Sequence, residues 1–317
     1  MISVVVPVYN VEKYIVTCLN SIVKQKERDF ELILVNDGSK DRSMDLAQDF
    51  LRDKDVTWKI INKENGGLAS ARNEGIRKAK GEYVVCIDAD DAISEDFLSE
   101  MLKHMDKDTD FVFCNFQYTK KQESPIDNNK ETITFDKENL LNAFLKRTIG
   151  FVVPSMLFRR SYLIDNDLFF DEKIRFSEDQ PFIWNVILHS TRSIYLYKKM
   201  YGYYTRENSI MTGSSAERII KSHNEFKQVI RSYFADYPEY KNIEEKILPR
   251  WELGALYTCA RSLDLNDYKT AYKEMNGKTI LKRIMGINEM KAYLLAVICS
   301  FSSTLMYRFC RRLDLNG

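Results

Sequence analysis

Cysteine and histidine are too scarce and too scattered in this sequence of 317 residues to build the sites they usually make. The six cysteines include no CxxC pair and have no histidine at zinc spacing, so neither a disulfide scaffold nor a structural zinc site is expected. The 47 basic and 46 acidic residues leave a net charge of +1, and without an overall field we expect no nucleic-acid partner. No basic leader opens the chain, and no apolar run reaches the roughly 18 residues of a membrane-spanning helix. These absences predict a reduced, cytoplasmic protein.

What the sequence does have is a regular alternation of two kinds of segment. From residue 2 to residue 116, short β-branched runs are separated by stretches with helical periodicity. The strands expected from this pattern are Ile2–Val6, Glu31–Val35, Thr57–Ile61, Glu82–Ile87 and Asp110–Phe116. The helices expected between them are about Val11–Gln25, Asp41–Arg52, Gly67–Lys80 and Ser94–Met105. Because continuous apolar runs such as Val4–Val6 are typical of strands with helices on both faces, we predict an α/β fold with a mostly parallel, doubly wound sheet.

The pattern changes after residue 116. The polar stretch Gln117–Asp136 is interpreted as a loop over the carboxyl end of the sheet, where ligands of such sheets bind. Further along, we expect a helix mixed with short strands in Leu140–Phe170, a helix in Phe182–His189, and a pair of aromatic strands in Ser193–Thr205. From Ala216 to the end the pattern is helical. These changes divide the chain into residues 1–116, 117–214 and 215–317.

Glycine is scarce overall, but five of the 12 glycines lie between residues 38 and 81, around the ends of the expected strands. Asp37 ends the second strand, and Gly38 after it permits a tight turn. A carboxylate in this position could accept the imide N–H of uracil, or it could serve an ordinary strand-to-helix turn. Both interpretations stay open on these residues alone.

Three carboxylates emerge within four residues after the strongest expected strand, in Asp88-Ala89-Asp90-Asp91. Unpaired carboxylates this close repel one another, and a hard cation such as Mg²⁺ or Mn²⁺ relieves the repulsion. Such a cation takes few protein ligands and keeps positions open for the phosphate oxygens of a substrate. The alternative is an exposed acidic turn before a helix that Ser94 caps.

Four segments taken together are more specific than any one of them. They are Val4-Val5-Val6-Pro7-Val8-Tyr9-Asn10, Val35-Asn36-Asp37-Gly38-Ser39, Asn65-Gly66-Gly67-Leu68-Ala69-Ser70-Ala71-Arg72-Asn73 and Asp88-Ala89-Asp90-Asp91. In this order and at these intervals, they resemble the nucleotide-sugar domain of the family-2 glycosyltransferases with the GT-A fold. The resemblance is close from Ile2 to Met105 and continues loosely to about Thr212. It implies that residues 1–116 are the nucleotide-sugar-binding half of a GT-A domain, 117–214 its acceptor-binding half, and 215–317 a helical region.

The resemblance also implies a nucleotide site at the carboxyl end of the sheet. Its residues would be Pro7, Tyr9, Asn10, Asp37, Gly67, Arg72 and Asp88. Tyr9 would lie near the uracil, and Asp37 would accept from the base N–H. Gly67 and Arg72 would border the nucleoside and diphosphate, with Asp88 near the ribose hydroxyls. Simple packing of Tyr9 and a surface salt bridge of Arg72 are the alternatives.

A metal site and a further phosphate contact follow from the same resemblance. Asp90 would ligate the Mn²⁺ or Mg²⁺ that bridges the two phosphates, with Asp91 as a supporting residue or alternative ligand. Arg206, in the loop after the aromatic strands, could reach a phosphate oxygen. Some relatives carry a histidine ligand in this region, and this sequence has none there.

The pair Glu178-Asp179, followed by Phe182, matches the acidic pair and aromatic residue that these enzymes place under the acceptor. Direct displacement with inversion needs a general base for the acceptor hydroxyl, and Asp179 would be that base. The alternative is that the two acids merely begin a helix before Pro181.

The activity implied is metal-dependent, inverting transfer of a hexose or N-acetylhexosamine from a UDP-sugar to a sugar hydroxyl. The acceptor would be a growing glycan, a glycolipid or a glycoprotein. A hypothesis of a different class is a non-catalytic, nucleotide-sugar-binding partner of another transferase, which the intact acidic motifs disfavour.

The apolar stretch Ala292–Tyr307 stands just before Arg308, Arg311 and Arg312. Basic residues beside an apolar face favour anionic lipid, so this helix could lie in the inner surface of the cell membrane as a peripheral contact. It could equally be buried against protein, as a docking helix or in a homo-oligomer. The sequence leaves the two interpretations level.

Overall fold

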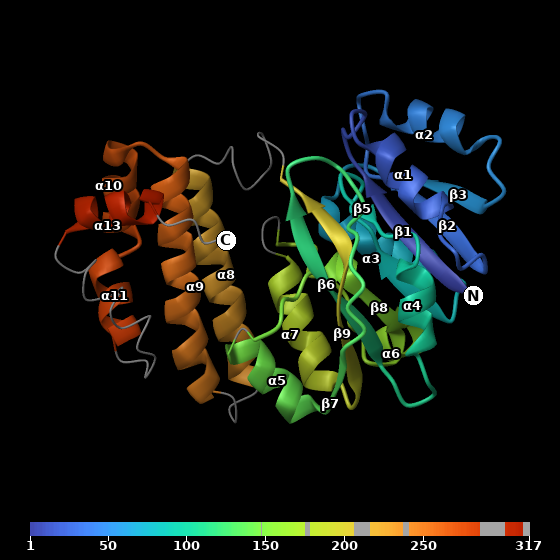
Figure 1. Ribbon diagram of the computed structural model, residues 1–317. Helices are drawn as coiled ribbons and strands as arrows, with labels where there is room; N and C mark the ends of the chain where they lie inside the picture. Colours follow the sequence, from blue (N-terminus) through green and yellow to red (C-terminus); the bar gives the residue numbers. More distant parts are fainter. Residues whose placement is uncertain (147, 175–177, 206–215, 237–240, 286–301, 313–317) are drawn as a thin grey trace. The chain divides into compact units, whose positions relative to one another are not determined.

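The computed structural model describes residues 1–146, 148–174, 178–205, 216–236, 241–285 and 302–312 (Figure 1). The chain divides into two compact units, Met1–Thr205 and Arg206–Gly317. The boundary that we predict between residues 214 and 215 falls in a stretch outside the described residues. Each unit is described by itself below.

The first unit is built on a nine-stranded sheet. Its strands are β1 (Ile2–Val8), β2 (Phe30–Asn36), β3 (Thr57–Asn62), β4 (Tyr83–Cys86), β5 (Ala92–Ile93), β6 (Phe111–Thr119), β7 (Thr132–Phe135), β8 (Met156–Arg159) and β9 (Ser193–Tyr204). The strand order is β3-β2-β1-β4-β8-β6-β9-β5, with β7 also paired to β9. Strands β1 to β4 are parallel, β8 is antiparallel to both β4 and β6, and β9 is parallel to β6. Six strands therefore end at the same side, which we call the carboxyl end of the sheet.

Helices cover both faces of this sheet (Figure 1). Apolar residues of α1 (Ile15–Val23), α2 (Ser43–Leu51) and α4 (Phe97–Lys103) share one buried cluster with alternate residues of β1 and β2. On the opposite face, α3 (Leu68–Lys78) packs against β1 and β2. The same face carries α6 (Arg160–Asp165) and α7 (Asp179–His189), whose aromatic side chains contact β6 and β8, and α5 (Lys137–Lys146) packs on α7. The doubly wound, mostly parallel sheet is confirmed.

Two local expectations are wrong. Residues 117–136 are not wholly a loop, because β6 continues through Thr119 and the segment Thr132–Phe135 forms β7 on β9. The aromatic segment is one strand of 12 residues and not a pair. The polar Lys198 that interrupts its apolar pattern lies at a shift in the β6–β9 register and forms an ion pair with Asp96, so the strand passes through without turning.

The second unit is helical, as expected from residue 216 onward. Its described helices are α8 (Ala216–Asp236), α9 (Lys241–Ser262), α10 (Leu265–Glu274), α11 (Gly277–Met285) and α13 (Ser303–Arg312). At its centre Glu252 of α9, only 1% exposed, pairs with Lys227 of α8 at 2.9 Å and with Arg283 of α11 at 2.6 Å. Two cations thus compensate one buried carboxylate and join three helices.

The tail helix α13 belongs to the apolar core of this unit. Met306 and Cys310 are buried in it, and the Tyr307 hydroxyl donates to the Leu263 carbonyl at 3.3 Å. Among the described residues, none of the helices has the length and apolar character needed to cross a membrane. Of the apolar stretch singled out in the sequence, residues 292–301 lie outside the description, and the part in α13 buries Met306 but leaves Leu305 42% exposed.

Candidate active site

Asp37 and the glycine loop, Gly66–Gly67, meet at the carboxyl end of the sheet. The Asp37 carboxylate, 3% exposed, accepts from the Gly66 N–H and the Gly67 N–H at 2.8 Å each and from Lys63 Nζ at 2.7 Å. Gly67 has a φ of 88° at the start of α3, a conformation that favours glycine. The predicted base-binding carboxylate is therefore the anchor that shapes the glycine loop, and any base would meet it already hydrogen-bonded.

The segment after β1 lies beside the turn after β2. Pro7 is buried inside β1, whereas the Tyr9 side chain is 47% exposed. Asn10 takes a left-handed conformation with φ of 52°, and its Oδ1 accepts from the Lys40 N–H at 2.9 Å. Tyr9 thus presents an exposed aromatic ring at the carboxyl end of the sheet, the end at which the glycine loop also lies. A nucleobase could stack on this ring.

Arg72 joins two motifs that lie 90 residues apart in the chain. Its side chain is 3% exposed, and its Nη2 lies 2.7 Å from Asp88 Oδ1 and its Nη1 3.2 Å from Glu178 Oε1. The guanidinium also lies over the Phe170 ring, 5.2 Å from its centroid, and its buried Nε has no hydrogen-bond partner among the residues that the structure describes. The surface salt bridge considered as an alternative for Arg72 is therefore wrong, because the guanidinium that forms both ion pairs is buried and does not lie on a helix surface.

Asp179 is the first residue of α7, directly after Glu178. Burial raises the pKa of Asp179, and the charge of Arg72 opposes that rise. Burial also raises the pKa of Glu178, again with Arg72 in opposition, while Asp179 adds to the rise. A carboxyl group with a raised pKa is a stronger base once ionised, which suits proton transfer near neutral pH.

The aromatic residue of the same motif lies elsewhere than the resemblance implies. Phe182 is 1% exposed and stacks on Phe170, with centroids 3.9 Å apart. It also meets the Phe158 ring of β8 edge-on. Phe182 is therefore a core residue that seats α7 on the sheet, and it is not accessible to an acceptor.

The acidic turn, Asp88–Asp91, divides its carboxylates among different tasks. Asp91, 2% exposed, accepts from the Tyr201 hydroxyl and from the Tyr204 N–H at 2.8 Å. Burial, then the charges of Asp90 and Asp88, raises the pKa of Asp91 to about 8. Asp88 forms an ion pair with Arg72, and Asp90 is partly exposed. Asp91 thus ties the acidic turn to β9.

The carboxylates of the acidic turn fit a cation that takes few ligands from the protein and most of its ligands from the substrate. Within the residues that the structure describes, no three His, Cys, Asp or Glu side chains gather as a ready-made metal site. Carboxylate oxygen is nonetheless the ligand that Mg²⁺ and Mn²⁺ prefer, and such ions keep several non-protein ligands. Of the two predicted ligands, Asp91 fits less well, because both of its carboxylate oxygens already accept from β9.

Sequence reasoning missed Lys63 and Tyr201, which hold Asp37 and Asp91 in place. Lys63 has no role in the sequence-based prediction, and Tyr201 enters it only as part of the aromatic strand before Arg206, without a role of its own. Arg206, the predicted phosphate contact, lies outside the described residues.

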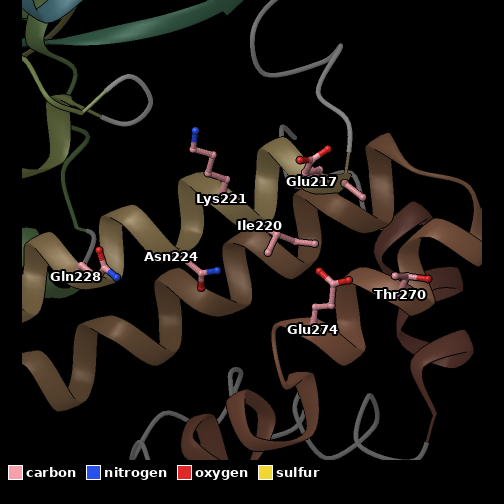
Figure 2. A pocket seen from close by; sticks show the side chains of 8 residues that line it. Glu217, Ile220, Lys221, Asn224, Gln228, Thr270 and Glu274 are labelled. Carbon is pink, nitrogen blue, oxygen red and sulfur yellow. The ribbon is translucent and has the colours of Figure 1, made fainter.

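A hollow of about 560 Å³ lies in the helical unit between α8 and α10 (Figure 2). It is lined by Ala216, Glu217, Ile220, Lys221, Asn224, Gln228, Thr270 and Glu274. Its two glutamates are exposed, and it contains none of the residues expected to bind nucleotide, cation or acceptor. The candidate active site is therefore the carboxyl end of the sheet.

Comparison with curated proteins gives related sequences from bacteria. EpsJ of Bacillus subtilis strain 168, called an uncharacterized glycosyltransferase, is 36% identical over 220 residues, which are 66% of this chain and 62% of EpsJ. TarS of Staphylococcus aureus, a poly(ribitol-phosphate) β-N-acetylglucosaminyltransferase, is 30% identical over 232 residues, which are 72% of this chain and 39% of TarS. The matched part of the chain thus spans less than two thirds of the length of either relative.

Solved structures show the same fold. TarS residues 1–349, crystallised with UDP-GlcNAc, match with a TM-score of 0.65 at 24% identity, over 98% of this chain and 90% of that chain. The mannosyltransferase PcManGT of Pyrobaculum calidifontis, in complex with GDP-Man and Mn²⁺, matches with a TM-score of 0.60 at 17% identity, over 99% and 87%. These likenesses confirm the GT-A fold.

The family model of glycosyl transferase family 2 matches residues 3–167, which carry the glycine loop, Arg72 and the acidic turn. This stretch is just over half of the chain. The chain therefore belongs to glycosyl transferase family 2.

Proposed function

We propose that this chain is an inverting glycosyltransferase that moves a hexose or N-acetylhexosamine from a UDP-sugar to a sugar hydroxyl of a glycan, glycolipid or glycoprotein. The observation that carries the proposal is the pair of contacts made by Arg72. Arg72 contacts both Asp88 of the acidic turn and Glu178, the neighbour of Asp179, so a single side chain bridges the two motifs. A donor site and a base with a raised pKa in one place are what displacement at an anomeric carbon needs.

Donor binding would use the side of the sheet that ends in β1, β2 and β3. The exposed ring of Tyr9 offers a stacking surface to the uracil, and the glycine loop that Asp37 anchors lets the chain approach the nucleoside closely. TarS, the relative solved with UDP-GlcNAc, supports a UDP-sugar as donor.

Asp90 would hold a Mn²⁺ or Mg²⁺, and the Mn²⁺ in PcManGT supports this choice. When bound, such a cation supplies positive charge to the departing diphosphate. The hydrogen bonds of Asp91 to Tyr201 and Tyr204 hold the backbone of the acidic turn in place, and this fixes the position of the neighbouring Asp90.

In the transfer step, Asp179 accepts the proton of the acceptor hydroxyl as its oxygen attacks the anomeric carbon. The bond from that carbon to the diphosphate oxygen breaks, and its electron pair leaves with UDP. Because attack comes from the side opposite the leaving group, the configuration inverts. Arg72 keeps Glu178, and with it the first turn of α7, beside the reacting groups.

Release of UDP from UDP-GlcNAc, UDP-glucose and UDP-galactose, each with Mn²⁺ or with EDTA, tests the proposal. We expect slow metal-dependent hydrolysis of one donor, since water replaces a missing acceptor. Tight binding of UDP with no hydrolysis or transfer of any donor would instead favour the non-catalytic binding partner.

A further inference from the structure

Strands β6 and β9 run past the level at which β4 ends. The pairing of β4 with β8 and of β8 with β6 puts Val84 level with Phe111, yet β6 continues to Thr119. Beyond β8 its partner is β9 alone, with Tyr118 opposite Tyr203. The extension therefore consists of β6 and β9, with the short β5 paired to the other side of β9 at Tyr201 and Gly202, and it projects beyond the end of β4.

One face of this extension carries three aromatic rings in contact. Phe116 and Tyr118, two residues apart in β6, point the same way, with centroids 5.5 Å apart and rings at 82°. Tyr118 and Tyr203 follow at 5.4 Å and 66°. Tyr118 is 56% exposed, and the other two are partly buried behind it. We call these three residues the aromatic platform.

The aromatic platform is fastened to the acidic turn. Asp91 accepts from both Tyr201 and Tyr204, the neighbours of the platform on β9. Gln122, four residues after Tyr118, donates from its Nε2 to the Asp91 carbonyl at 3.2 Å. The chain after β6 passes so close that a Cβ on Gly202 would lie 2.5 Å from the Glu123 carbonyl oxygen.

Its position in the strand order separates it from the nucleotide side. The residues proposed to bind the nucleotide follow β1, β2 and β3, on one side of β4. Strand β6 lies on the other side, two strands from β4, which corresponds to about 10 Å. The acidic turn between them is where the diphosphate would end, so a sugar ring beyond it would face the platform.

An exposed tyrosine supported by two further rings offers a rigid apolar face with a polar rim. The C–H faces of a pyranose ring match such a surface, and its hydroxyls stay free for water or side chains at the edge. Phe182, the aromatic residue expected under the acceptor, is closed off in the core, so it cannot provide this contact.

We propose that the aromatic platform, with Tyr118 at its exposed end, stacks against a pyranose ring of the acceptor. This assignment rests on the proposed function, since it takes the transfer centre to lie between the acidic turn and α7. It adds a class of acceptor: one that presents a pyranose, not an open-chain polyol, beside the hydroxyl that reacts.

Binding of methyl N-acetyl-β-D-glucosaminide in the presence of UDP, followed by saturation-transfer NMR, tests the platform without requiring turnover. Tyr118→Ala should weaken this binding about tenfold, the change that 1.4 kcal/mol produces. Tyr118→Phe keeps the ring and should stay within about twofold of the parent. Sorbitol, which has hydroxyls but no ring, should not bind detectably to the parent or to either variant.

Ile126→Ala, at a 93% exposed residue of the chain segment after β6, is the matched control and should change nothing. Thermal melts of each variant confirm folding. Equal affinity of the glycoside for the parent and Tyr118→Ala would overturn the proposal. The proposal would also be overturned if Tyr118→Ala weakened the binding of UDP-GlcNAc but not of UDP, and left glycoside binding unchanged, because the platform would then hold the donor sugar. Failure of the proposed function looks different: no donor is hydrolysed, whatever residue 118 is.

Discussion

The two carboxylates proposed to act at opposite ends of the site are held in contrasting ways. Asp37, on the nucleotide side, is surrounded by donors: two backbone N–H groups and a lysine. Asp179, on the acceptor side, is partly buried next to another carboxylate, and Arg72 only partly offsets the rise in pKa that burial causes. The difference teaches that one residue type serves two purposes. Satisfied hydrogen bonds make Asp37 a fixed anchor, whereas poor solvation raises the pKa of Asp179 and suits it to the proposed role of base.

The largest expected effect comes from Asp179→Asn, which keeps the side-chain shape and removes the proton acceptor. Transfer should fall by about 10²–10⁴-fold, the usual contribution of a general base, while UDP affinity is unchanged. Single-turnover rates measure the loss. Asp165→Asn, at an exposed residue of α6, is the control, and Glu178→Gln should be affected less than Asp179→Asn. Transfer at the parent rate in Asp179→Asn would give the base role to another residue.

Arg72→Met should be next, because it leaves Asp88 and Glu178 facing each other without a cation. Loss of one partner of a buried pair predicts destabilisation of about 3 kcal/mol, measured by urea unfolding. Arg72 also opposes the rise in the pKa of Asp179, so without it that pKa rises further and the acid limb of the pH–rate profile moves to higher pH.

Arg77→Met on the same helix is the matched control, since Arg77 is exposed and pairs with Glu172 at 3.4 Å. Its loss should cost less than about 1 kcal/mol and leave the pH profile in place. If the two variants behave alike, Arg72 has no special part in coupling the two sides of the site.

Asp37→Asn should weaken UDP binding by about 1.5–3 kcal/mol, the scale of a hydrogen bond to a charged group. The neutral amide holds Lys63 and the glycine loop less well, so the loop loses its fixed shape. Competition among UDP, GDP and dTDP provides the measurement, with Asp45→Asn on an exposed face of α2 as control. Preference for GDP would contradict a uracil pocket at Tyr9 and Asp37.

The smallest expected effect is on the melting temperature, and it tests the same difference between Asp37 and Asp179. A carboxyl group whose pKa is raised by folding binds its proton more tightly in the folded state, so its contribution to stability is lost as pH rises through the folded pKa. Asp179→Asn removes this loss, and its melting temperature should exceed that of the parent by a margin that grows from acidic to neutral pH. Asp37→Asn should lower the melting temperature, because the neutral amide holds Lys63 and the two glycine N–H groups less well. A pH-independent difference for Asp179→Asn would mean that its carboxyl group is not strained by burial.

Much of the first 116 residues could be predicted from the sequence, because local pattern encodes local structure. The predicted strands and helices there coincide with β1 to β4, β6 and α1 to α4 to within a few residues, apart from the short β5. Four parallel strands must place their carboxyl ends together, so Asp37, the glycine loop and the acidic turn were bound to share one end of the sheet. Apolar runs and turn residues suffice for that inference.

Only the tertiary structure decided which side chains meet across long separations. Glu178 reaches Arg72 across 106 residues, and Asp91 reaches Tyr201 across 110. Tyr118 stands in a polar stretch of the sequence and Phe182 closely follows two acidic residues, yet the first is exposed and the second is buried. No local pattern separates such cases, because a side chain's solvation and partners depend on how sheet and helices pack, and the sequence carries that packing as a whole and not at any single position.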